Sequence, residues 1–230
     1  MSSQSGLMIY TASTWIIPVI IAITFHEAAH GFVAHQLGDD TAWRLGRVTL
    51  NPFKHVDLFG TIILPAVLLL TRAPFLFGYA KPVPVNFRAL RNPRRDMVWV
   101  AAAGPATNLL LAMAAGFMAH LVIFLPANAD HWYLQNLQNA IDINVVLAVF
   151  NMIPLPPLDG GRVAVGLLPN VFALPLARLE RYGMAIIIGL LFILPILGSN
   201  LGIDLNVLGW LISGPTHALI ELIIRLTGNS

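Results

Sequence analysis

The sequence contains no cysteine among its 230 residues, and only 10% of its residues are Asp, Glu, Lys or Arg. The missing cysteine excludes disulfide bonds, thiolate metal sites and a cysteine nucleophile. Soluble domains carry about 25% charged residues, so the low charge content argues against a soluble globular protein. The net charge of +2 comes from a few basic residues that lie between apolar segments, and we expect no nucleic-acid binding.

Long apolar stretches take the place of the missing charges, because 57% of the residues are hydrophobic. A membrane-spanning helix needs about 20 residues, and the candidate stretches are residues 7–33, 59–77, 97–126, 139–168, 183–198 and 205–226. Proline and polar residues interrupt the second stretch. We therefore predict an all-α polytopic membrane protein with about five transmembrane helices. We also expect one re-entrant or short membrane segment and a small extended or β element.

The charges in the loops predict how the chain is oriented. Basic residues gather in residues 39–57, 78–96 and 156–182, whereas residues 127–138 and 199–204 contain no Lys or Arg. Basic short loops stay in the cytoplasm. The N-terminus is therefore expected outside and the C-terminus inside. Because the second apolar stretch joins two cytoplasmic loops, we expect it to dip into the membrane rather than cross it. Residues 1–13 lack the basic region of a cleavable signal peptide.

The first apolar stretch contains the motif HEAAH at residues 26–30. Residues four apart lie on one face of a helix, so His26 and His30 can present both imidazoles to one ion, with Glu27 beside them. H-E-x-x-H on a helix is the metalloprotease arrangement, in which the glutamate is the general base. The alternative is a pair of hydrogen-bonded helix-end histidines. Ionisable groups are costly within a membrane helix, which favours the metal site.

Catalytic zinc takes three protein ligands and keeps one position open, so a third ligand is needed. Asp142 and Asp159 are the acidic candidates in the fourth stretch. At ~1.5 Å per residue, Asp159 reaches the depth of His26 and His30, whereas Asp142 lies near the opposite end. The prolines and glycines around Asp159 allow close backbone approach. We predict one Zn²⁺ per chain with Asp159 as its third ligand. A solvated aspartate in an ordinary Pro/Gly turn is the alternative.

HEAAH together with NMIPLPPLDGGR (residues 151–162) resembles the site-2 protease family of intramembrane zinc metallopeptidases, peptidase family M50. The similarity extends to AAGPATN (residues 102–108) and to FGYAKPVPVNFRALRNPRRD (residues 77–96), and it covers roughly residues 14–165. The second of these segments is similar to the small bacterial and archaeal members, which lack PDZ and CBS domains.

The resemblance implies that His26, His30 and Asp159 ligate zinc and that Glu27 is the catalytic glutamate. Asn108 and Asn151 are implied to contact substrate or to support the transition state.

The activity implied is hydrolysis of peptide bonds within or near the transmembrane segments of membrane-protein substrates. The expected partners are such a protein or peptide and the lipid bilayer, in the inner or cell membrane of a prokaryote. Residues 1–230 are expected to form one domain, with a catalytic core at about 14–168 and two C-terminal helices at about 183–226. Residues 78–85 could bind substrate as an added strand or be a plain Pro-rich loop.

A membrane metal-ion transporter that uses the helix histidines as a transient site is the alternative function. The outer halves of the apolar stretches carry few polar residues, which disfavours this reading. His55 is expected to be a solvated loop histidine.

Overall fold

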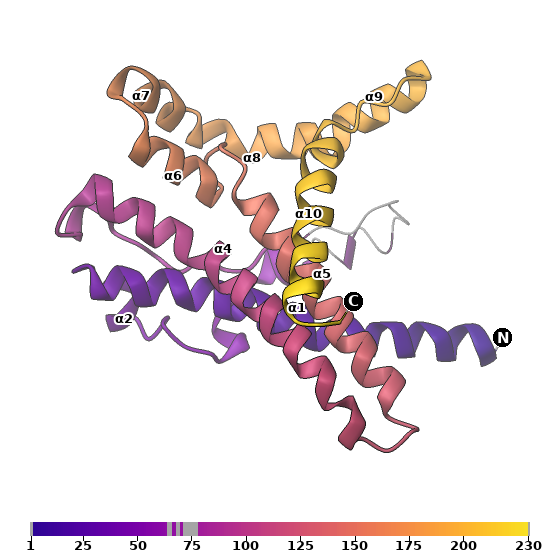
Figure 1. Cartoon of the computed structure of the whole chain (residues 1–230). Helices are drawn as coiled ribbons and strands as arrows, with labels where there is room; N and C mark the ends of the chain where they lie inside the picture. The colour runs from indigo at the N-terminus through magenta and orange to yellow at the C-terminus, as the bar shows by residue number, and fades with distance from the viewer. Residues whose placement is uncertain (1, 64–65, 68–69, 71–77, 230) are drawn as a thin grey trace.

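The computed structural model describes residues 2–63, 66–67, 70 and 78–229 (Figure 1). Within these ranges the regular elements are all helices and none is a strand, which confirms the all-α fold class. The expected β element is therefore not a strand in the described chain, because residues 78–86 run without regular structure. The expected re-entrant segment begins as the π-helix η2 (Leu58–Ile63), and most of its remainder lies outside the described residues.

Three long helices form the centre of the fold: α1 (Ser2–Gln36), α4 (Pro93–Met118) and α5 (Asp130–Asn151). Each of them packs against the other two (Figure 1). The 3-10 helix η4 (Ala119–Phe124) extends α4 towards α5. Helix α4 runs antiparallel to α1 and to α5, so the motif in α1 faces the middle of α4.

Within the part of the chain that the structure describes, four helical segments are long and apolar enough to cross a membrane: Gly6–Gln36, Pro93–Phe124, Glu180–Leu201 and Val207–Leu226, with mean hydropathies of 1.5 to 2.3. Large apolar side chains on these segments, such as Ile16, Leu110 and Leu211, remain exposed as lipid-facing residues do. The protein is an integral membrane protein. Helix α5 is long enough to span a bilayer but is more polar than the others. Of its buried amides, Asn139 donates a 3.0 Å hydrogen bond to the Thr14 carbonyl of α1, and Asn144 accepts one of 2.7 Å from Asn108 of α4.

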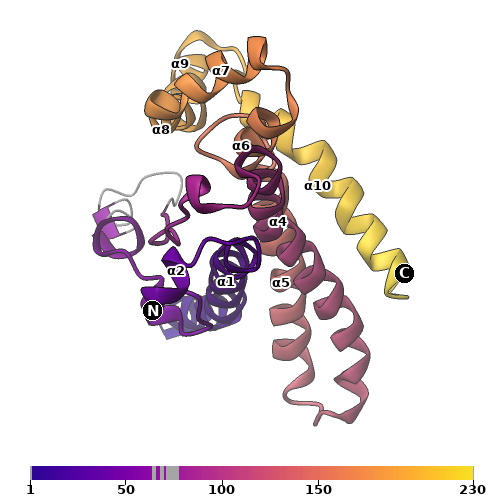
Figure 2. The same ribbon diagram turned by 90° about the vertical axis from the view of Figure 1, so that its left-hand side faces the viewer.

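The second half of the chain continues through short helices: α6 (Asp159–Leu167), α7 (Asn170–Arg178), α8 (Glu180–Ile188), the π-helix η5 (Gly189–Ile193) and α9 (Leu194–Leu201). Helix α6 packs on α4, where the Arg94 guanidinium donates hydrogen bonds to the carbonyls of Gly166 and Leu168. Helix α10 (Val207–Leu226) lies on the other side of α4 and α5 from α1 (Figure 2).

Helix α10 runs in the same direction as α4. His120 Nε2 donates a 2.6 Å hydrogen bond to the carbonyl of Thr227, and Asn229 Nδ2 donates one of 2.8 Å to that of Gly116. The C-terminal end of α10 therefore lies beside the C-terminal end of α4. The loop charges predict instead that these two ends lie on opposite sides of the membrane, with the C-terminal end of α4 outside and that of α10 inside. The structure does not agree with that placement of the C-terminus, and the side of the membrane that each end faces stays a prediction.

Candidate metal centre

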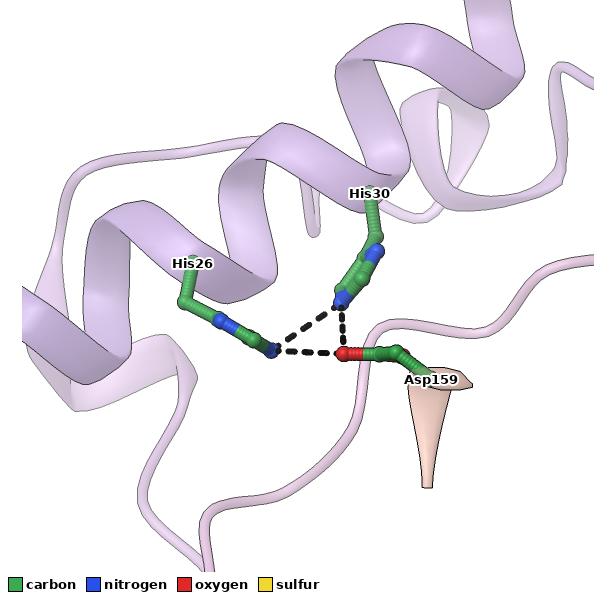
Figure 3. A group of neighbouring side chains, drawn as sticks. All are labelled: His26, His30 and Asp159. Carbon is green, nitrogen blue, oxygen red and sulfur yellow. Dashed lines mark hydrogen bonds and ion pairs between the residues drawn. The ribbon is translucent and has the colours of Figure 1, made fainter. Parts of the chain in front are cut away.

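His26, His30 and Asp159 come together at one buried point, although 129 residues separate His30 from the aspartate along the chain (Figure 3). Asp159 Oδ2 lies 3.2 Å from Nε2 of His26 and 3.4 Å from Nε2 of His30. The two Nε2 atoms are 3.1 Å apart. The one-turn spacing of the histidines in α1 and the matching depth of Asp159 thus bring the three side chains together, as the sequence predicts.

Hydrogen bonds to the other ring nitrogens fix how the imidazoles point. His30 Nδ1 lies 2.7 Å from the carbonyl oxygen of Val100, and His26 Nδ1 lies 2.6 Å from Oδ1 of Asn108. A carbonyl oxygen only accepts, so Nδ1 carries the proton in both rings. The Nε2 lone pairs are then directed toward Asp159. Such support of the second ring nitrogen is usual for metal-binding histidines.

The orientation of the Asn108 amide is itself determined by its neighbours. Its Nδ2 donates 3.3 Å to the carbonyl of Ala22 and 2.7 Å to Oδ1 of Asn144, whose own Nδ2 donates 2.8 Å to Ala140. Because the Ala22 oxygen can only accept, Oδ1 of Asn108 must face His26. Asn108 is fully buried. It therefore contacts the candidate metal centre through His26.

The three donor atoms fit a metal ion. Asp159 Oδ2 is buried and accepts no hydrogen bond, and two imidazole lone pairs face it. Three acceptors around one point repel one another unless a cation lies between them. Two imidazole nitrogens and one carboxylate oxygen are a donor set that zinc binds in catalytic sites.

Glycine at position 104 of α4 leaves room beside these donor atoms. A Cβ there would lie 2.5 Å from His30 Nε2 and 2.7 Å from His26 Nε2. The glycines after Asp159 have a similar effect, since a Cβ on Gly160 or Gly161 would collide with the backbone of residues 152–156. The Pro/Gly segment is thus packed on the start of α6. Asp159 is buried there, so the alternative of a solvated aspartate is wrong.

Glu27 lies beside the donor atoms without being one of them. Its Oε2 accepts a 2.7 Å hydrogen bond from the backbone N–H of Val83, in the irregular segment that follows η2. The group of side chains that could share an ion contains His26, His30 and Asp159 only, within the part of the chain that the structure describes. This arrangement agrees with the expectation that the glutamate is not a ligand.

The model of a family described as "Peptidase family M50" matches residues 119–194, which include Asp159. YwhC of Bacillus subtilis, which is named "Putative zinc metalloprotease YwhC", is 41% identical over 188 residues, which are 80% of this chain and 81% of that protein. The chain belongs to peptidase family M50. Its resemblance to the site-2 proteases is thereby confirmed.

Other proteins named as putative zinc metalloproteases are similar to this chain at lower identity. Rip2 of Mycobacterium tuberculosis is 28% identical over 223 residues, which cover 94% of this chain and 79% of Rip2. The archaeal protein MJ0611 of Methanocaldococcus jannaschii is 31% identical over 152 residues, covering 64% of this chain and 67% of MJ0611. No solved structure gave a significant match.

The remaining expectations about polar residues have mixed outcomes. Asn151 donates 3.0 Å to the carbonyl of Leu147 within its own helix and makes no hydrogen bond to the metal centre. His55 is only 3% exposed, so the prediction of a solvated histidine is wrong. Asn144, which accepts a hydrogen bond from Asn108, was not predicted from the sequence. A polar amide within an apolar stretch could have indicated it.

The expectation that the outer halves of the helices are nearly free of polar residues is also wrong. Buried Thr14, Asn136 and Asn139 lie in the half of α1 and α5 away from the metal centre. These are neutral side chains, and Asn139 and Thr14 bond to each other. None of the three is a histidine, aspartate or glutamate that would add a metal ligand.

Proposed function

We propose that this protein is an intramembrane zinc metalloprotease that hydrolyses peptide bonds within or near the transmembrane segments of membrane-protein substrates. The observation that supports this most is the combination in α1 of two donor atoms for a metal with a glutamate held beside them. This motif lies in a helix that is apolar enough to cross a membrane. Membership in a peptidase family and similarity to proteins named "Putative zinc metalloprotease" support the chemistry.

His26, His30 and Asp159 would hold one zinc ion per chain. Zinc, when bound, would polarise the scissile carbonyl and make a water molecule more acidic. Glu27 would accept the proton of the attacking water and pass it to the leaving amine nitrogen. The Val83 N–H holds Oε2 of this carboxylate, and no hydrogen bond within the described chain occupies Oε1. Glu27 is therefore fixed at one oxygen and free to exchange a proton at the other.

Asn108 would support this chemistry by keeping the proton of His26 on Nδ1. Its side chain is completely buried, and its hydrogen bonds go to His26, Ala22 and Asn144. A substrate-binding role for Asn151 has no such support, because its amide is engaged in α5.

The apolar helices support a proposal for the partners and the location. A transmembrane helix hides its carbonyls in internal hydrogen bonds, so the substrate must unwind locally before it is cleaved. Residues 78–85 lie next to Glu27 and would be suited to bind the unwound chain as an added strand. We propose that the protein acts in the cell membrane of a prokaryote, with the N-terminus outside and the loop at residues 78–92 in the cytoplasm. A transporter is less well supported, because a second group of metal-binding side chains is absent from the described residues.

A purified preparation with a single-span test substrate would test the proposal. We expect cleavage within or near the span, loss of cleavage on adding a zinc chelator, and recovery with added Zn²⁺. Glu27→Gln keeps shape but removes the base, so cleavage should fall by ~10²–10⁴-fold. Its zinc content should stay near one per chain, since no ligand is removed.

Two outcomes would contradict the proposal. Cleavage by Glu27→Gln at the wild-type rate would exclude the glutamate as the base. Equal cleavage of the test substrate and of a soluble version lacking the apolar span would exclude the intramembrane substrate class, while leaving the peptidase activity in place.

A further inference from the structure

The irregular segment at residues 78–86 is fastened to the protein at alternate backbone N–H groups. The bonds run from Tyr79 to the carbonyl of Gly60 (3.1 Å), from Lys81 to that of His55 (2.8 Å) and from Val83 to Glu27 Oε2 (2.7 Å). Alternation with a period of two is the pattern of an extended strand. One edge of the segment therefore faces the body of the protein, and the catalytic glutamate is one of its attachment points.

Asp39 holds the same segment three residues further along. Its Oδ2 accepts a 2.6 Å hydrogen bond from the N–H of Asn86, while Oδ1 accepts from the N–H and the hydroxyl of Thr41, at 2.9 and 2.5 Å. The side chain is fully buried and has no basic partner among the described residues. Burying a carboxylate without a cation is costly, and these three hydrogen bonds offset part of that cost while fixing the carboxylate against Asn86.

The end of α1 places this carboxylate. Gly38 has a φ of +110°, and the N–H of Asp39 donates 2.9 Å to the carbonyl of Ala34 while that of Gly38 donates 3.1 Å to His35. This left-handed turn ends the helix and directs the chain back over it. Glu27 and Asp39 are thus carried by one helix and its terminal turn. Glu27 accepts the hydrogen bond from the Val83 N–H and Asp39 accepts the one from the Asn86 N–H, so the two carboxylates hold the segment at two points.

We propose that Asp39 is a positioning residue of the protease, which acts through the backbone of residues 83–86 to keep the Val83 N–H on Glu27. This inference rests on the proposed role of Glu27 as the base. Val83 is buried against Gly31, where a Cβ would come within 2.9 Å of the valine, so the segment fits closely over α1. Releasing Asn86 loosens the C-terminal side of Val83 and lets the Glu27 carboxylate turn.

The other side of Val83 has its own attachment. Arg47 Nη2 donates 2.8 Å to the carbonyl of Lys81 and 3.3 Å to that of Pro82. This contact does not involve Asp39. Changing the aspartate should therefore release residues 83–86 while residues 79–82 stay in place, and the fold and the metal ligands should be preserved.

The experiment compares Asp39→Asn with Asp40→Asn in the full-length protein. Asp40 is a matched control because it is the partly exposed neighbour of Asp39 and pairs with His35 and Arg44 instead of with residues 78–86. Its hydrogen bond with His35 holds the pKa of its carboxyl below the ordinary value. Three quantities are measured: zinc content, kcat and KM on the single-span substrate, and amide hydrogen exchange across residues 78–90. For Asp39→Asn we expect kcat to fall roughly 10- to 100-fold, as misplacement of a catalytic group by about 1 Å does.

Zinc content and KM should stay at wild-type values in Asp39→Asn, and the amides of Val83 and Asn86 should exchange faster. Asp40→Asn should match wild type in all three. A role in folding alone would instead lower the yield or the zinc content and leave kcat per zinc-loaded molecule unchanged, which would overturn the proposal. Unchanged exchange at Val83 would overturn it as well, whatever the activity.

A second pair of variants keeps the test open if Asp39→Asn does not fold. Asn86→Pro removes the N–H that Asp39 binds, at a residue whose φ of −95° is near the range of proline. Asn86→Ala keeps that N–H and loses only the side chain. The proposal expects lower kcat in the proline variant alone. Should Glu27→Gln prove fully active, the proposed base would be wrong, while the exchange at Val83 would still decide whether Asp39 holds the segment.

Discussion

Replacing Gly104 with alanine is a sharp perturbation of the metal centre, because it adds one methyl group and removes nothing. That methyl group would lie 2.5 Å from Nε2 of His30 and from Cε1 of His26, whereas ordinary contacts begin near 3.4 Å. Both imidazoles, or α4 itself, must therefore move by about 0.9 Å. Zinc–nitrogen bonds are about 2.0–2.1 Å long and tolerate deviations of about 0.2 Å. The required shift is several times larger than this tolerance.

The expected effect follows from that shift. Misplacing a catalytic group by about 1 Å costs on the order of 10²-fold in rate, and we expect kcat/KM of Gly104→Ala to fall by about this factor. Zinc affinity should fall by at least about 10-fold, as it does when the support of a ligand is disturbed. Helix propensity opposes the loss, since alanine favours a helix over glycine by about 1 kcal/mol. A loss of function therefore cannot come from a weaker α4.

The assay pairs metal titration with cleavage of the single-span substrate, and Gly214→Ala is the control. Gly214 also lies within a helix, α10, but a Cβ there would meet nothing within 4 Å. The control should retain wild-type zinc affinity and activity. Wild-type zinc affinity and activity in Gly104→Ala would contradict the placement of the donor atoms against Gly104 of α4.

Two further predictions concern the surroundings of the metal and the direction of α10. Asn108→Ala removes the acceptor for His26 Nδ1 and should lower zinc affinity by about 10–100-fold, whereas Asn151→Ala should leave it unchanged in the same titration. Cysteines at Leu7 and appended to the C-terminus should react with an impermeant maleimide from one side of the membrane, and a cysteine at Asn92 from the other; the native chain has none to interfere. Labelling of the appended cysteine from the Asn92 side would contradict the direction of α10.

The ligand triad was open to prediction because it depends on two regular features of the sequence. Helical periodicity puts His26 and His30 on one face of α1, and counting residues along the apolar stretches brings Asp159 to their depth. Neither step requires knowledge of how the helices pack. Ionisable side chains in apolar stretches are also few in this chain, so the candidates for a third ligand were limited from the start.

The hydrogen bonds that orient the ligands and Glu27 could not be predicted from the sequence, because many of them come from backbone groups. The Val100 carbonyl orients His30, the Val83 N–H orients Glu27, and neither group is distinguished by its side chain. Asp39 illustrates the same difficulty. In the sequence it reads as a charged loop residue after a helix, yet the turn at Gly38 buries it completely. Such contacts become visible only when segments far apart in the sequence have been placed.

The direction of α10 shows the limit of reasoning from hydropathy and loop charge. Glu180–Leu201 has a mean hydropathy of 2.3 and follows a basic loop, so both rules favour a crossing there. Hydropathy, however, reports that a helix is stable in lipid, and not that its two ends face opposite sides. Leu211, near the start of α10, lines one cavity with Met152 and Pro154 at the end of α5. Because α10 then runs antiparallel to α5, the chain between Pro154 and Leu211 makes no net crossing. The positive charges of that region are also partly engaged within the protein, since Arg162 lies 3.4 Å from Glu180. A basic residue that pairs with the protein's own carboxylate is a weaker signal of orientation than one that faces the lipid surface.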